Sequence, residues 1–139
     1  MSRTSRIYSQ GKKLIKREGP GWRLARDSAR QTFSVLIGGE QWAVELSESE
    51  WVDFVSVVNE LITQHGLVKS QLMEDESIYL EIQKSSWWGC IDGNKKDWSL
   101  KLIFHGDGAN IRGFEMYWPI PVAQSFVKAM RNMWDSEID

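Results

Sequence analysis

The side chains that most often carry out chemistry in proteins are few in this sequence: two histidines and a single cysteine. His65 falls at the end of a predicted helix, where the helix dipole favours a cation, and His105 falls in a predicted turn. Cys90 lies in an apolar segment with neither a histidine nor a second cysteine beside it. We therefore expect a small buried side chain, not a nucleophile or a metal ligand. These residues predict no catalytic centre, no metal site and no cofactor.

Glycines and carboxylates offer other routes to chemistry. Gly106-Asp-Gly108 lacks the further glycine and the following helix that a phosphate-binding loop requires, so it predicts a turn. Glu48 and Glu50 are explained by helix capping, and Glu74–Glu76 is explained by a solvent-exposed loop. Neither group predicts the paired carboxylates of general acid–base catalysis.

Tryptophan is the unusual part of the composition, with eight in 139 residues. Trp87 and Trp88 are adjacent in a predicted strand. Because successive side chains of a strand point to opposite faces, one of the two should face outward. The tryptophans that fall on apolar stripes are expected in the core, and these are Trp42, Trp51, Trp98 and Trp118.

The outward tryptophan would have aromatic and basic neighbours, because Tyr79, Lys101 and Tyr117 all fall on predicted outer faces. Together with Trp87 or Trp88 they predict an aromatic and basic platform suited to stacking bases or anchoring a protein partner. In the alternative arrangement, the outer faces of the two sheet halves pack on each other or on the N-terminal segment. That packing would bury these aromatic side chains.

Positive charge is concentrated near the N-terminus. Residues 1–30 contain nine basic and two acidic residues, a net charge of +7, and the remainder carries −9. A basic segment on an acidic body is typical of proteins that meet phosphates, anionic lipid or an acidic protein, and it is also common in solvated tails. We predict a basic flexible arm over residues 1–18 and include Lys12, Lys13 and Arg23 among the candidate binding residues.

Length and composition predict a single soluble domain over residues 1–139. Hydrophobic residues make up 42% and charged residues 26%, which excludes intrinsic disorder and a collagen-like repeat. No apolar run reaches the roughly 18 residues of a membrane span, and the first residues lack the apolar core of a secretion signal. A single cysteine excludes an internal disulfide and is typical of a reducing compartment, so we expect a cytoplasmic protein.

The first half of the chain predicts strands followed by a helix. Gly19-Pro-Gly21 predicts a break, and Ser47 to Glu50 matches a capping box before a helix that ends at His65-Gly66. The helix has apolar residues at helical spacing from Trp51 to Ile62. Alternation predicts a hairpin turn at Gly38-Gly39 and strands over residues 13–16, 22–27, 32–37 and 42–46.

The second half repeats this order of elements. Pro119 and Pro121 force extended backbone before a final helix. The apolar stripe of this helix contains Val122, Phe126, Met130 and Met133. Alternation predicts strands over residues 78–83, 87–91, 98–104 and 111–118, with turns at 92–94 and 105–108. We therefore predict an α+β fold: antiparallel sheets with two helices, and an apparent duplication of a unit of three or four strands and a helix.

Three motifs carry a resemblance that covers nearly the whole chain: Gly-Pro-Gly-Trp-Arg at residues 19–23, Ser-Glu-Ser-Glu-Trp at 47–51 and Tyr-Trp-Pro-Ile-Pro at 117–121. With the order of elements, they resemble a small cyanobacterial family of unknown function, domain of unknown function 1818. That family is similar in fold to the plant Whirly proteins, which bind single-stranded nucleic acid and contain a four-stranded sheet and a helix twice in one chain. The resemblance implies a fold rather than an activity.

The lysine-rich strand motif of Whirly proteins is absent here. A nucleic-acid role would therefore depend on the N-terminal arm together with Arg23 and Lys101.

Three classes of function follow from these features. We favour a nonenzymatic protein-interaction or assembly module with an unidentified protein partner, acting as a monomer. The alternative is a single-stranded nucleic-acid-binding protein that uses the basic arm and the exposed aromatic residues. An enzyme, which we do not expect, would need a deep pocket lined by Glu81, Cys90 and His105.

Overall fold

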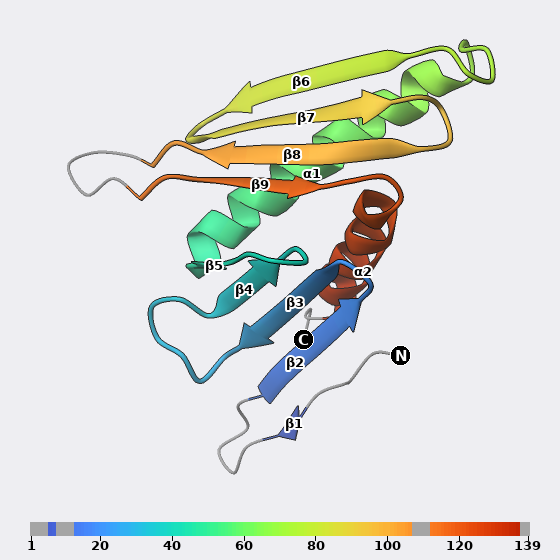
Figure 1. The fold of residues 1–139 in the computed structure, drawn as a ribbon. Coiled ribbons are helices and arrows are strands. Elements are labelled where there is room, and N and C mark those ends of the chain that lie inside the picture. The colour runs from blue at the N-terminus through green and yellow to red at the C-terminus, as the bar shows by residue number, and fades with distance from the viewer. Residues whose placement is uncertain (1–5, 8–12, 107–111, 137–139) are drawn as a thin grey trace. The chain divides into compact units, whose positions relative to one another are not determined.

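The computed structural model describes residues 6–7, 13–106 and 112–136, with side chains for residues 14–106 and 112–133 (Figure 1). The chain forms two compact units. The first contains the residues up to Val52 and those from Ser125 onward, and the second is Asp53–Gln124. Each boundary falls inside a helix, so each helix begins in one unit and continues in the other.

The first unit contains an antiparallel sheet whose neighbouring strands follow chain order. Gly19 pairs with Trp22 at the end of the β2–β3 hairpin, and Gly21 adopts a φ of 82°, which a residue without a Cβ tolerates. The break predicted at Gly19-Pro-Gly21 is this turn. The strands are β1 (Arg6–Ile7), β2 (Lys13–Gly19), β3 (Trp22–Asp27), β4 (Val35–Gly38) and β5 (Ala43–Leu46).

Strand β2 is longer than the predicted strand over residues 13–16. It continues to Gly19 because it is paired with β3 from Leu14, opposite Asp27, to Gly19, opposite Trp22. Residues 13–18 of the predicted arm therefore lie in a strand. Residues 1–5 and 8–12 lie outside the described part of the chain.

The β4–β5 hairpin is displaced from its predicted position. Strand β4 begins at residue 35 instead of 32, because the segment between Asp27 and Ser34 forms a loop closed by a hydrogen bond from the Asp27 amide to the Ser34 carbonyl, 2.8 Å. The turn follows Gly38 instead of including it. The Gly39 amide donates to the Trp42 carbonyl across this turn at 2.9 Å.

Helix α2 (Val122–Ser136) contributes its residues from Ser125 onward to the first unit. The Phe126 ring packs edge-on against Trp22 at 6.3 Å between ring centroids. The predicted apolar stripe is confirmed at Phe126, Met130 and Met133, which are buried, whereas Val122 is half-buried. The sheet supplies further core residues of this unit, namely Ile15, Leu24, Val35, Ile37 and Leu46.

Helix α1 (Glu48–Lys69) begins with the predicted capping box. The Ser47 amide donates to the Glu50 carboxylate at 2.9 Å, and the Glu50 amide donates to the Ser47 hydroxyl at 3.2 Å. The Glu48 carboxylate connects the start of the helix to the first sheet. It accepts hydrogen bonds from the Ser34 hydroxyl at 2.5 Å and from the Arg26 guanidinium at 2.7 Å.

The predicted end of this helix at His65-Gly66 is wrong, because α1 continues to Lys69. A glycine inside a helix costs only about 1 kcal/mol relative to alanine, and tertiary packing readily offsets that cost. His65 provides such packing: it is buried, its ring lies 5.9 Å from that of Trp98, and its Nε2 lies 3.1 Å from the Asn94 carbonyl oxygen. His65 is thus a core residue that lies one turn before the end of the helix.

The second unit packs α1 against one face of a four-stranded antiparallel sheet. Phe54 of α1 makes edge-on contacts with Trp87 at 5.5 Å and with Trp118 at 6.3 Å. Of the four tryptophans expected in the core, Trp51, Trp98 and Trp118 are buried and Trp42 is half-buried. The strands are β6 (Ile78–Lys84), β7 (Trp87–Gly93), β8 (Trp98–Phe104) and β9 (Phe114–Trp118), and Figure 1 shows them in this order.

Two boundaries in this sheet differ from the prediction. Strand β7 continues through Gly93, because the turn is formed by Asn94–Asp97, in which the Asn94 carboxamide accepts hydrogen bonds from the Lys96 and Asp97 amides, both at 2.9 Å. Strand β9 begins at Phe114, and residues 107–111 lie outside the described part of the chain. The fold class is confirmed: among the described residues the chain is α+β, with two antiparallel sheets, two helices and a repeated order of strands and helix.

Gly89 of β7 lies against side chains of α1 and gives a test of this packing. A Cβ at this position would lie 2.8 Å from Leu102 Cδ1 and 3.2 Å from Leu61 Cδ1, and both leucines are buried. We expect Gly89→Ala to lower the free energy of unfolding by roughly 1–3 kcal/mol through overpacking.

The matched control is Gly66→Ala in the same unit. No atom lies within 4 Å of a Cβ added there, so the change should raise stability by up to about 1 kcal/mol through helix propensity. Urea unfolding followed by tryptophan fluorescence measures both variants. Equal stability of Gly89→Ala and the unmodified protein would contradict the packing described for α1.

Candidate aromatic interface

The alternation of side chains along β6–β9 creates two different faces. Ile82, Ile91 and Leu100 belong to the face that packs on α1, and all three are buried. The opposite face is named the aromatic face here. Its residues pair with one another across the strands, and they are Tyr79, Glu81, Gln83, Trp88, Cys90, Asp92, Ser99, Lys101, Ile103, Glu115 and Tyr117.

The two adjacent tryptophans lie on opposite faces, as the alternation predicts. Trp87 is fully buried against Phe54 and lies 4.8 Å from Phe104 between ring centroids. Trp88 is on the aromatic face, where it is half-buried and pairs with Gln83 and Ile103. Trp88 is therefore the outward residue of the pair, and Trp87 is not available to a partner.

The two tyrosines of the aromatic face are open to solvent. Tyr79 is 54% exposed and Tyr117 is 49% exposed. Tyr79 and Tyr117 are therefore not buried by packing within their own unit. Asp92 is the cross-strand partner of Tyr79, and Trp88 lies four residues from Asp92 along β7, a distance of roughly 13 Å at the usual rise of a strand. The aromatic side chains are thus spread over the face and do not form one stack.

The charge of this face differs from the prediction. Lys101 is present on the face, where it lies 3.5 Å from Glu115. Glu81, Asp92 and Glu115 are all exposed, so three carboxylates face a single lysine. The aromatic face is acidic, not basic, because the alternation that places Tyr79 and Lys101 on it also places these carboxylates there.

The acidity of the face also affects its titratable groups. Tyr79 donates a hydrogen bond to the Glu81 carboxylate at 2.9 Å, and this bond is the main reason that the pKa of Tyr79 is raised to about 12. Burial raises the pKa of the Cys90 thiol, and the neighbouring Asp92 raises it further. Cys90 is 7% exposed, which confirms the predicted small buried side chain. Both acids are thus held in their neutral forms at neutral pH.

The basic residues predicted from the N-terminal region belong to the first unit or lie outside the described residues. Arg23 is exposed on β3 in the first unit, and its side chain lies across Gly38 of the neighbouring strand. Lys13 begins β2, and only its backbone is described. Lys12 lies outside the described residues.

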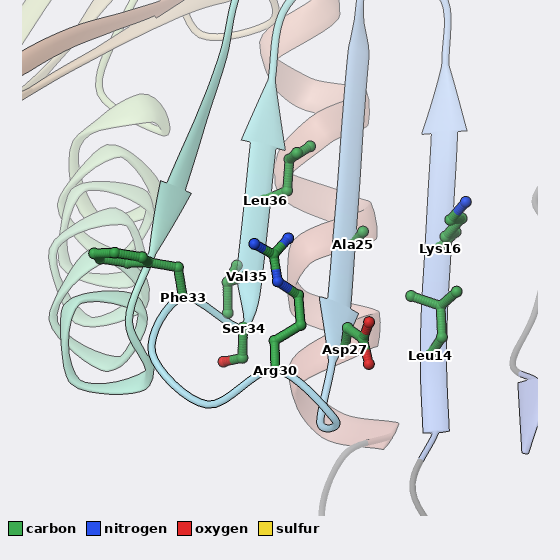
Figure 2. Close-up of a pocket in the computed structure, with 9 residues that line it drawn as sticks. All are labelled: Leu14, Lys16, Ala25, Asp27, Arg30, Phe33, Ser34, Val35 and Leu36. Atoms are coloured by element: carbon green, nitrogen blue, oxygen red, sulfur yellow. The ribbon is translucent and has the colours of Figure 1, made fainter. Parts of the chain in front are cut away.

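The first sheet carries a shallow pocket that sequence analysis did not predict (Figure 2). Its volume is about 260 Å³, and its apolar lining includes Leu14, Ala25 and Leu36 from three neighbouring strands. The charged groups at its edge include Asp27, which accepts a hydrogen bond from the Ala29 amide at 3.0 Å, and Arg30. The sequence signal for this surface is the weak alternation of β2, which places Leu14 and Lys16 on the same side of the strand.

Internal partners account for much of the charge around this pocket. Arg30 is paired with Glu45 at 2.8 Å, and the charged residues of the lining are of both signs. The pocket therefore lacks the convergent unpaired polar groups that define a specific ligand site.

The other residues considered for chemistry do not converge. Glu81 and Cys90 are cross-strand neighbours, but they belong to the aromatic face and do not line the pocket described above. His105 is exposed after β8 and donates its backbone amide to the Ser86 carbonyl at 2.8 Å. In the described part of the chain, no three histidine, cysteine, aspartate or glutamate side chains are grouped as a metal site would require. Neither described helix is long and apolar enough to cross a lipid bilayer.

The pKa of Tyr79 offers a direct test of the geometry on the aromatic face. Replacing Glu81 with alanine removes both the acceptor and the negative charge, so the pKa of Tyr79 should fall from about 12 toward 10. A pH titration of tyrosine absorbance measures this, and the Tyr79→Phe variant identifies the step that belongs to Tyr79. An unchanged titration of Glu81→Ala would show that the two side chains are not in contact.

Comparisons with known proteins give a family for this chain and no activity. A solved structure from Prochlorococcus sp. NATL2A is 52% identical in sequence to this chain and superposes with a TM-score of 0.81. It is described as a protein with unknown function from the DUF155 family. The similarity covers 86% of this chain and 98% of that chain. No curated protein matches the sequence. The family model for DUF1818, a domain of unknown function, matches residues 17–133, and the chain therefore belongs to the DUF1818 family.

Proposed function

We propose that this protein is a nonenzymatic interaction module that binds a protein partner through the aromatic face. The observation that supports this proposal is the exposure of Tyr79 and Tyr117 on the same sheet face as Trp88. Tyrosine and tryptophan are enriched at the centres of protein interfaces, because each combines a large apolar area with a polar group.

The sheet also prepares these side chains for binding. Trp88 projects from β7 and Tyr117 from β9, and both strands pair with β8. Helix α1 packs on the opposite face of these strands, where Phe54 contacts Trp87 and Trp118. A backbone that is already ordered loses little further entropy when a partner binds. Ile103, which is half-buried beside Trp88, adds apolar area at this position.

Single-stranded nucleic acid is the second candidate partner, and the aromatic side chains favour it because bases stack on such rings. The resemblance to Whirly proteins points in the same direction. Phosphate binding needs several Lys or Arg contacts, however, and the aromatic face holds Lys101 against three carboxylates. The charge of the face therefore favours a protein. We propose a cytoplasmic monomer as the working form, since one chain already contains two sheets and two helices among its described residues.

Site-specific photocrosslinking tests the proposed function. We expect a benzophenone amino acid in place of Tyr117 to capture a defined protein from a cyanobacterial lysate, with a yield that nuclease treatment does not change. The matched control is the same amino acid in place of Leu67, which is 69% exposed on α1 in the same unit. This position should capture no defined product.

Two results would contradict the proposal. Capture of nucleic acid alone at position 117 would favour the second candidate. Equal capture of the same proteins at positions 117 and 67 would show that the aromatic face is not a specific interface.

A further inference from the structure

The aromatic face carries negative charge that the described residues do not neutralise. The Lys101 ammonium lies 3.5 Å from the Glu115 carboxylate, so these two charges largely offset each other. Glu81 and Asp92 have no basic partner among the described residues, and Glu81 accepts its hydrogen bond from the neutral Tyr79 hydroxyl. Two exposed carboxylates on one sheet face therefore remain available to a positively charged partner.

The carboxylates and the aromatic rings alternate in position. Asp92 pairs with Tyr79 across the strands, and Glu81 lies two residues from Tyr79 on the same side of β6. On β9, Glu115 and Tyr117 are separated in the same way. An aromatic ring beside a carboxylate suits a guanidinium group, which can donate two hydrogen bonds to the carboxylate while its plane packs on the ring.

The titration of the face agrees with this geometry. The carboxylate of Glu81 holds the neighbouring Tyr79 hydroxyl in its neutral form, and burial together with Asp92 does the same for the Cys90 thiol. A group that brings further negative charge, such as a phosphate, meets repulsion at these positions.

We infer that the aromatic face binds a basic protein segment whose arginine side chains pack on Tyr79 and Tyr117 and pair with the neighbouring carboxylates. This inference depends on the proposed function and names the chemistry of its partner. The distance from β6 to β9 is three strand spacings, roughly 14 Å, which an extended segment of about four residues covers. Tyr79 and Tyr117 lie on the two outer strands of this sheet, so a segment that contacts both rings needs a separate arginine for each.

Binding of synthetic peptides to the full chain tests the inference. The probes are fluorescein-labelled heptapeptides of arginine, lysine and glutamate, and the readout is fluorescence anisotropy at low and moderate salt. We expect the arginine peptide to bind more tightly than the lysine peptide, because the guanidinium stacks on aromatic rings better than an ammonium does. The glutamate peptide should not bind.

Two triple variants separate a specific site from a general attraction of charges. The first, Glu81→Gln with Asp92→Asn and Glu115→Gln, should weaken the arginine peptide about tenfold, as expected for the loss of several surface charge pairs. The control is Glu18→Gln with Glu40→Gln and Asp53→Asn, which changes three exposed carboxylates outside the aromatic face. It alters the net charge equally and should change the affinity less than about twofold.

The outcomes also distinguish the inference from the proposed function. Equal weakening in both triple variants, or tighter binding of the glutamate peptide or of oligo-dT, would overturn the inference. If the crosslinked partner contacts position 117 through a neutral or acidic segment, the inference fails while the proposed function stands. If no protein is captured there, both fail. Thermal unfolding of each variant verifies that it remains folded.

Discussion

The packing of Phe54 between Trp87 and Trp118 is the interaction on which the second sheet depends. It fixes which face of β6–β9 lies against α1. Since side chains alternate along a strand, this one choice decides the position of every other residue in the four strands. Trp88 faces outward because Trp87, its neighbour in sequence, packs under the helix, and the register of the strands places Tyr79 and Tyr117 on the same face as Trp88. The buried core and the exposed aromatic face are thus two results of a single register.

Much of this arrangement follows from the sequence by local rules. The two-residue period placed Tyr79, Lys101 and Tyr117 on one face, and the reciprocal bonds between Ser47 and Glu50 are those that the capping pattern predicts. The rule that adjacent strand residues face opposite ways was enough to predict that one of the two tryptophans is outward. The rule could not say which, because that depends on the contact with Phe54, more than thirty positions away in the sequence.

The remaining differences have physical causes that act over long range. Helix α1 passes Gly66 because His65 is held by Trp98 and by the Asn94 carbonyl, and neither partner is close in sequence. Strand β2 is flanked by charges that weaken its pattern, and pairing with β3 extends it. The acidity of the aromatic face follows from the same alternation, which places Glu81, Asp92 and Glu115 on the face with Lys101. The prediction of a basic surface rested on the lysine and the aromatic residues and did not include these carboxylates.

The position of the unit boundaries inside both helices has a consequence for how the chain folds. The order of elements repeats, yet the helix that follows the first sheet places Phe54 against the second, and the helix that follows the second sheet places Phe126 against Trp22 of the first. A fragment cut between the two repeats would contain a sheet together with a helix whose main apolar contacts lie in the missing half. The repeat visible in the sequence is therefore not an autonomous folding unit, and each half completes its core only after nearly the whole chain has been synthesised.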